Sequence, residues 1–162
     1  MAILKKSAFL SFNLSSEIFA ITVTKVLEVL EIQPVTKVPQ TPEYIRGVIN
    51  FRGDILPVID TRRKFNMESV ADTPKTVIIV LDLVIFNKKL IVGIIADSVK
   101  DVIEISPTDV KEVPSLGSRY NSDFLEGMIK TDSGFIMILN IEKVFTADDV
   151  SLVENSTESD KD

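Results

Sequence analysis

Hydrophobic residues along the chain recur with the period of β-strands rather than that of helices. Short runs rich in Ile, Val and Phe alternate with turn residues over most of its length. These runs predict strands at residues 9–14, 17–21, 26–32, 48–51, 54–59, 76–84, 89–96, 128–130 and 135–139. Many short strands with regular turns and little helix are typical of an all-β barrel or sandwich.

Tight turns between neighbouring strands predict β-hairpins. The turns fall at Ser15-Ser16, Arg52-Gly53, Asn87-Lys88 and residues 131–134. Helical signals are short. Thr41-Pro42-Glu43 resembles a capped start with Pro at the first helical position, and residues 61–65 and 141–145 each fit a single turn. We therefore expect a few short helices between the strands.

A faint internal duplication is the most informative feature of the pattern. A shift of 80 residues places Gly47 on Gly127, and the surrounding apolar positions agree. A second match, at a shift of 73, places Val26 on Val99 and Val29 on Val102. Chance likeness between any two hairpins is the alternative. The preferred interpretation is two similar β units that must pack on each other, since neither buries much surface alone. The space between them is a natural binding site.

The composition removes most catalytic chemistry. The chain has no Cys and no His, so disulfides, thiolate nucleophiles and zinc sites built from these residues are excluded. The six glycines are scattered and form no phosphate-binding loop. No acidic cluster has the ligand density of a calcium loop. We predict no catalytic residue, no cofactor and no metal site.

One carboxylate pair supports a rival interpretation. Asp54 and Asp60 lie six residues apart on a predicted strand and would share a face. Such a pair could serve as acid and base in a small β-barrel hydrolase. A turn role for Asp54 and a cap or strand-end role for Asp60 is the preferred interpretation.

Charge is concentrated at the C-terminal end. The net charge is −6, and residues 147–162 hold six acids against one base. We expect residues 146–162 to form an acidic, flexible tail in which Asp148 and Asp149 are solvated. A nearly neutral body without Trp argues against a nucleic-acid module, which needs basic, aromatic-rich faces. No apolar run is long enough to span a membrane, so we expect a soluble protein without direct membrane insertion.

Two residue sets are candidates for partner binding. The first is basic and comprises Arg46, Arg52, Arg62, Arg63 and Lys64. Solvated charges that guard a strand edge explain Arg63 and Lys64. Arg52, at a hairpin tip, could instead form bidentate bonds with a partner carboxylate.

The second set consists of the matched valines of the two units. Each valine taken alone is most simply a core residue. Together they could line a groove into which an amphipathic helix docks, with Glu28 and Asp101 on its polar rim. The members are Val26, Val29, Val99 and Val102.

Three segments resemble the CheW family of chemotaxis adaptors. Residues 44–60, Tyr-Ile-Arg-Gly-Val-Ile-Asn-Phe-Arg-Gly-Asp-Ile-Leu-Pro-Val-Ile-Asp, are similar to its long central signature. Residues 97–102 and 140–145 look like its two later landmarks. The resemblance runs from about Ala8 to Phe145. It implies one CheW-like domain, residues 8–145, made of two intertwined SH3-like five-stranded β-barrels with a few short helices.

The resemblance also implies a function. Family members are non-catalytic adaptors that couple methyl-accepting chemotaxis receptors to the regulatory domain of the histidine kinase CheA. They are cytoplasmic and are recruited to membrane-associated receptor arrays. A CheV-type adaptor fragment lacking its receiver domain is the alternative. The family's partner-binding positions fall on Val26, Glu28, Val29, Gly47, Arg52, Val99 and Val102.

Two positions deserve separate expectations. Gly47 matches a family glycine needed for the turn into the hairpin. Thr61 departs from the family, where many members have Leu, and is expected to face outward or pack locally.

Overall fold

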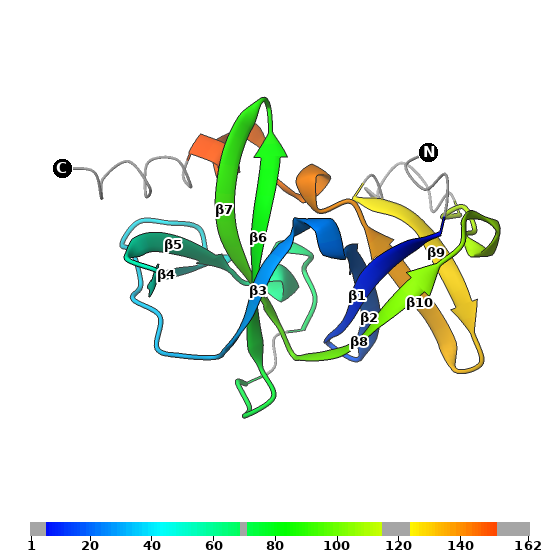
Figure 1. The fold of residues 1–162 in the computed structure, drawn as a ribbon. Helices are drawn as coiled ribbons and strands as arrows, with labels where there is room; N and C mark the ends of the chain where they lie inside the picture. Colours follow the sequence, from blue (N-terminus) through cyan, green and yellow to red (C-terminus); the bar gives the residue numbers. More distant parts are fainter. Residues whose placement is uncertain (1–5, 69–70, 115–123, 152–162) are drawn as a thin grey trace.

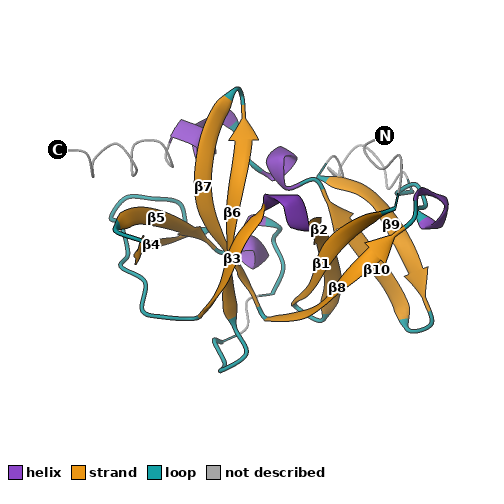
Figure 2. Cartoon of the chain, viewed as in Figure 1, coloured by secondary structure: helices purple, strands orange, loops and turns teal. Residues whose placement is uncertain are grey.

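The computed structural model describes residues 6–68, 71–114 and 124–151 of the chain, and strands dominate this part (Figures 1 and 2). The acidic residues from 152 onward lie outside the described residues. The strands are β1 (Ser7–Leu14), β2 (Glu17–Thr22), β3 (Val26–Glu31), β4 (Ile45–Phe51), β5 (Asp54–Ile59), β6 (Val77–Ile85), β7 (Lys88–Ala96), β8 (Ser98–Ile105), β9 (Leu125–Thr131) and β10 (Gly134–Leu139). The short helices are η1 (Val23–Lys25), α1 (Thr61–Lys64), η2 (Pro107–Asp109) and η3 (Ile141–Val144), followed by a helical segment at 147–151.

The strands form two curled five-stranded sheets. Strands β3 to β7 make the central barrel, in the order β3-β6-β7-β5-β4. The two ends of the chain make the terminal barrel, in the order β8-β1-β2-β10-β9. In each barrel an isolated β-bridge links the segment that follows one edge strand to the opposite edge strand. The bridge joins Thr36 to Val48 in the central barrel and Lys111 to Met128 in the terminal barrel. The predicted all-β fold of two five-stranded barrels is confirmed.

The barrels are intertwined because the two halves of the chain exchange a hairpin. Strands β1–β5 and β6–β10 follow the same order along the sequence. The β1–β2 hairpin nevertheless pairs with β8 and β10, and the β6–β7 hairpin pairs with β3 and β5. In Figure 1 the blue N-terminal strands accordingly lie among the yellow and orange C-terminal ones. Each barrel therefore needs both halves of the chain.

The pairing register confirms the duplication at single-residue level. The parallel pair Val58 to Gly93 in the central barrel corresponds to Ile138 to Ala20 in the terminal barrel. These four residues match at the shifts of 80 and 73 that the sequence showed. The two repeats therefore occupy equivalent places in the two barrels.

The hairpin turns follow the sequence closely. Both central residues have positive φ at Ser15-Ser16 and at Arg52-Gly53, as type I′ turns require. The β6–β7 turn has its positive φ values at Phe86 and Asn87, one residue before the predicted Asn87-Lys88.

Two predictions about local structure are wrong. Residues 98–105 form strand β8, where the sequence pattern predicted no strand. The segment beginning at Thr41 is a turn rather than a helix, in which the Ile45 amide donates to the Pro42 carbonyl at 3.0 Å. Ile45 then starts β4, because its side chain is needed in the core that the two barrels share.

Three apolar clusters hold the molecule together. One smaller cluster fills the central barrel around Ile78 and Val80, and another fills the terminal barrel around Phe9. The largest takes residues from both barrels and lies between them, and we call it the shared core. On β6, Ile79 and Leu81 face the shared core while their neighbours face the barrel interior, so the strand is buried on both sides.

Candidate partner-binding surface

Strand β3 forms one outer edge of the central barrel's sheet and carries two of the matched valines. Val26 pairs with Leu81 and Val29 pairs with Ile79, and both partners belong to the shared core. Because directly paired residues lie on the same face of a sheet, both valines face the side of β3 that looks toward the other barrel. Val26 is half-buried against the shared core, whereas Val29 is 40% exposed.

Strand β8 repeats this arrangement at the edge of the terminal barrel's sheet. Val99 pairs with Phe12 and Val102 pairs with Leu10, which are again shared-core residues. Val99 packs against that core, and Val102 is 64% exposed. Each barrel thus presents one half-buried and one exposed valine on the side that faces the other barrel.

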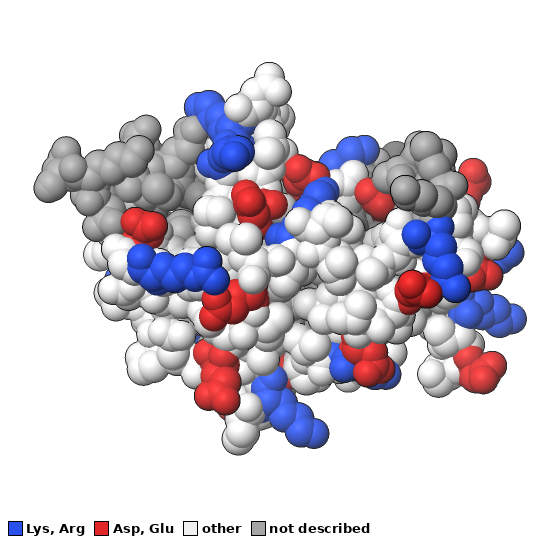
Figure 3. Space-filling model, in the orientation of Figure 1, with Lys and Arg blue, Asp and Glu red and all other residues white. Residues whose placement is uncertain are grey.

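The face that carries β3 and β8 is largely uncharged in its middle. Figure 3 shows this face, with Lys, Arg, Asp and Glu gathered mainly around a broad white area where the two barrels meet. Leu27, 42% exposed on β3, adds to the apolar surface and was not among the predicted site residues. Exposed large apolar side chains that gather on one face mark an interaction surface.

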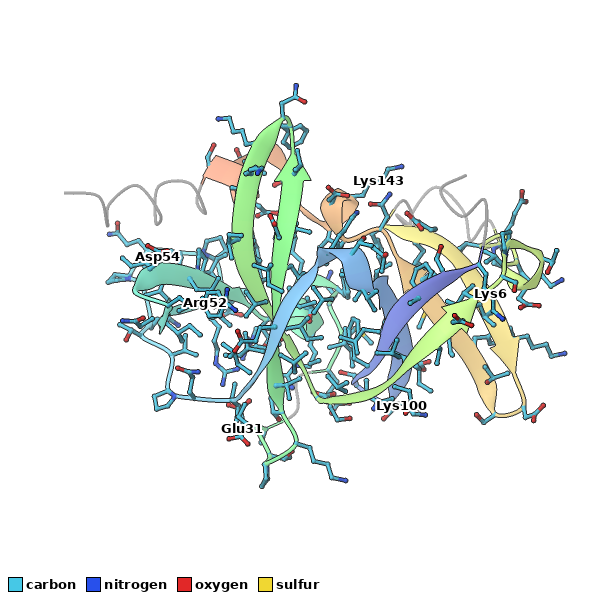
Figure 4. The ribbon with its side chains drawn as sticks, in the orientation of Figure 1. Lys6, Glu31, Arg52, Asp54, Lys100 and Lys143 are labelled. Atoms are coloured by element: carbon cyan, nitrogen blue, oxygen red, sulfur yellow. The ribbon has the colours of Figure 1, made fainter. Side chains whose placement is uncertain are left out.

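Arg52 and Glu28 lie in contact beside this face. Arg52 occupies the β4–β5 turn with φ 53°, and its Nη2 donates to Glu28 Oε1 at 2.7 Å. The guanidinium also lies 4.7 Å from the centre of the Phe51 ring. The Arg52 side chain remains 64% exposed, so part of its hydrogen-bonding capacity is open to a partner. In Figure 4 it projects from the hairpin near Asp54, which is also exposed.

Gly47 is placed differently from the other predicted site residues. It is buried within β4, before the hairpin turn, so the expectation that it makes that turn is wrong. Its φ of +145° and its approach to Thr36 explain the glycine instead, since a Cβ here would overlap the Thr36 carbonyl oxygen. Gly127 meets Lys111 at the equivalent crossing in the terminal barrel. Both glycines therefore leave room for the segment that closes each barrel, at Thr36 and at Lys111, to pass close to the strand that carries the glycine.

The corner where β5 enters α1 is an ionic cluster. Asp60 caps α1 by accepting from the amides of Arg62 and Arg63, which confirms the predicted cap role. Arg62 is only 1% exposed and contacts Asp60 at 3.1 Å and Asp97 at 2.7 Å. Burial alone would lower the pKa of Arg62, but its hydrogen bonds with these two carboxylates raise it on balance. Arg62 is therefore a structural residue.

The prediction that Lys64 and Asp149 are solvated is wrong, because the two side chains are 15% and 0% exposed and pair with each other. Lys64 Nζ lies 2.6 Å from Asp149 Oδ2 and 4.1 Å from the centre of the Tyr44 ring. Asp149 is fully buried and also accepts from the Tyr44 hydroxyl and the Thr146 amide. Burial works to raise the pKa of Asp149, but these donors, Lys64 foremost, lower it on balance. Burial and the same carboxylate raise the pKa of Tyr44 to about 12.

One smaller expectation is confirmed, and one local motif was missed. Thr61 packs locally, fully buried, with its hydroxyl donating to the Ile95 carbonyl at 2.7 Å. Thr146 and Asp149 bond to each other's amides, which is a capping box that a Thr-x-x-Asp pattern could have signalled. The chain is therefore folded through residue 151.

Sequence reasoning also missed the tip of the β6–β7 hairpin. Val84, Phe86 and Ile91 are 52%, 63% and 37% exposed there, and Figure 1 shows the hairpin projecting beyond the rest of the central barrel. In the parts of the chain that the structure describes, no acidic cluster could hold a metal ion. Within the same parts, no helix is long and apolar enough to cross a membrane.

Comparison with known proteins decides the family. The model of the CheW-like domain matches residues 8–149. The chain belongs to the CheW-like domain family. It is 33% identical to the chemotaxis protein CheW of Klebsiella aerogenes, over 93% of this chain and 89% of that protein. It is 31% identical to the chemotaxis protein CheW of Bacillus subtilis, over 82% and 83%.

A solved CheW structure agrees with the fold. The crystal structure of the scaffolding protein TtCheW from Thermoanaerobacter tengcongensis superimposes with a TM-score of 0.75 at 31% identity. The match covers 88% of this chain and 94% of that one. The resemblance noted in the sequence is confirmed, and the chain is placed in a family of chemotaxis scaffolds.

Proposed function

We propose that this protein is a non-catalytic adaptor that couples methyl-accepting chemotaxis receptors to the regulatory domain of the histidine kinase CheA. It would act in the cytoplasm, at receptor arrays next to the membrane. Membership of a chemotaxis scaffold family supports this proposal. The observation that carries it is the pair of exposed valines, Val29 and Val102, presented by two edge strands on one face whose middle is largely uncharged.

The receptor-binding part of the proposal uses this apolar face. A receptor tip is a helical hairpin, and an amphipathic helix docks through apolar anchors at i, i+3 and i+4. Val29 and Val102 are exposed enough to meet such anchors, while Val26 and Val99, on the same two strands, pack against the shared core. Rigid packing beneath an exposed contact lowers the entropy lost on binding.

The kinase-binding part of the proposal uses the hairpin that carries Arg52. A guanidinium that already has Glu28 as a partner on one side is held in place for a second carboxylate. Coupling then requires no bond making or breaking. The adaptor binds one state of the kinase better than the other, and receptor binding changes that preference.

Calorimetry of the full chain against the purified CheA regulatory domain tests this function. Saturable one-to-one binding is expected, and Arg52→Glu should weaken it by roughly 30-fold, the loss typical of an interface arginine. Lys130→Glu is the matched control, because Lys130 is also exposed but lies on β9 of the other barrel. Absence of binding by the folded wild-type chain would contradict the kinase half of the proposal.

A double variant separates the two roles of Arg52. Arg52→Glu combined with Glu28→Arg restores the internal ion pair with its polarity reversed. If Arg52 contacts the kinase directly, the double variant regains stability but not affinity. Regained affinity would show that the ion pair only shapes the hairpin. For the receptor half, Val102→Asp should abolish capture by a receptor-tip fragment while Val84→Asp leaves it unchanged.

A further inference from the structure

The terminal barrel contains a pocket that the proposed function does not use. Its volume is about 220 Å³. A space of this size suits one side-chain-sized group. Its walls include four apolar side chains and two charged ones, Phe9, Ile21, Leu139, Ile141, Lys25 and Glu126.

The two charges in the pocket are not equivalent. Lys25 already forms an ion pair with Glu142, and Glu142 also accepts from the Val84 amide at 3.3 Å. Glu126 is partly buried, and within the described residues its carboxylate has no hydrogen bond or ion pair. A partly buried carboxylate without a donor is costly, and this cost attracts a cation. Burial raises the pKa of Glu126 and Glu142 adds to this effect, while the opposing charges, Lys25 foremost and Lys143 among them, offset only part of it.

The equivalent corner of the central barrel shows what this position accepts. The residue at the place of Glu126 there is Arg46, which bonds to Asp72 and lies 3.9 Å from Asp60. The buried guanidinium of Arg62 fills the rest of that corner between two carboxylates. The fold thus places guanidinium groups against carboxylates in one barrel, while the other barrel has a carboxylate beside an open space.

We propose that the pocket binds an organic cation, an ammonium or guanidinium group on a short apolar stem, with Glu126 as its carboxylate partner. The apolar wall would contact the stem, and the carboxylate would accept hydrogen bonds from the charged end. Such a group could be a free small molecule or an Arg or Lys side chain of a partner protein. The site does not rest on coupling between receptor and kinase, and it is tested on the purified chain alone.

The test is a nuclear magnetic resonance titration of the ¹⁵N-labelled full chain with n-butylguanidinium. We expect saturable amide shifts at residues that line the pocket. Glu126→Gln keeps the volume, removes the charge and should weaken binding by roughly tenfold or more. Glu112→Gln is the control, since Glu112 is exposed on the same barrel and should leave binding unchanged. Dispersed spectra of both variants establish that they are folded.

Two results would overturn the proposal. One is the absence of saturable shifts in the wild-type chain, and the other is equal binding by the wild type and Glu126→Gln. A second titration, with the capped peptide Ala-Ala-Arg-Ala-Ala, identifies the source of the cation. Binding of the peptide at the same residues supports a partner side chain. Binding of n-butylguanidinium alone supports a small molecule.

Discussion

The corners of the two barrels contain ion pairs of opposite polarity between corresponding connections. In the central barrel Arg62 follows β5 and pairs with Asp97, which follows β7. In the terminal barrel Glu142, the residue matched to Arg62 by the duplication, pairs with Lys25, which follows β2. The first pair is 1% and 22% exposed, and the second is 28% and 29% exposed. Both barrels therefore have an ion pair between these two connections. The burial of each pair determines how much it contributes to stability.

The largest difference should come from removing the cation of each pair. Arg62→Met leaves Asp60 buried without its main partner and should lower the free energy of unfolding by about 3–5 kcal/mol. Lys25→Met removes a partly exposed pair and should cost about 1 kcal/mol or less. Urea denaturation of both variants measures the difference.

Arg63→Met is the control for an arginine lost from the same helix. Its side chain is 47% exposed, so a loss below about 1 kcal/mol is expected. Equal losses for Arg62→Met and Lys25→Met would mean that burial does not distinguish the two corners.

The glycines at the two barrel closures should also differ. Gly47→Ala would place a Cβ onto the backbone of Thr36 at a φ of +145° and should cost about 3 kcal/mol or more. Gly127→Ala meets mainly the Val110 side chain, which can shift, at a φ outside the positive range, so about 1–2 kcal/mol is expected. Gly53→Ala has open space but a φ of +88° and reports the cost of backbone strain alone. A larger loss at Gly127 than at Gly47 would contradict this interpretation of the closures.

Predictability from the sequence also differed between the two barrels. Strands that form apolar runs between turn residues, such as β5 with its four consecutive buried residues, followed from the sequence pattern, and the duplication aligned their equivalents. Strand β8 was missed because it lies at a sheet edge and is exposed along most of its length, so Val99 to Val102 do not alternate. A strand of this kind is recognised from its partner β1 rather than from its own residues.

Buried charges were the second limit. Arg62 and Asp149 looked like surface residues, because charged side chains are almost never fully buried unless they are paired. Their partners, Asp97 and Lys64, lie 35 and 85 residues away in the sequence. Only the folded chain brings such groups together. By contrast, the sequence identified both Arg52 and Glu28 as site residues but did not predict that they form an ion pair.

A third prediction concerns Asp149, whose carboxylate pairs with Lys64 of α1 in the central barrel. Lys64→Met removes its main cation and should cost about 2 kcal/mol at neutral pH. In the wild type the pKa of Asp149 is lowered. The ionised carboxylate therefore stabilises the fold at pH values above its ordinary pKa of 3.8, and this stabilisation is lost as the pH falls below that value. In the variant, burial instead favours the protonated carboxyl. The deficit should therefore shrink at about pH 3, which thermal unfolding at both pH values measures.

The smallest effect should come from Glu126 and should have the opposite sign. Burial raises the pKa of this carboxyl above its ordinary value of 4.5, so the ionised form costs stability once the pH rises past that value. Glu126→Gln should be nearly neutral at about pH 4 and stabilising at about pH 8. Arg46→Gln, at the matched position of the central barrel, should destabilise at both pH values because it removes a cation from Asp60 and Asp72. A stabilising effect of Glu126→Gln that did not change with pH would show that the side chain is poorly packed rather than poorly paired.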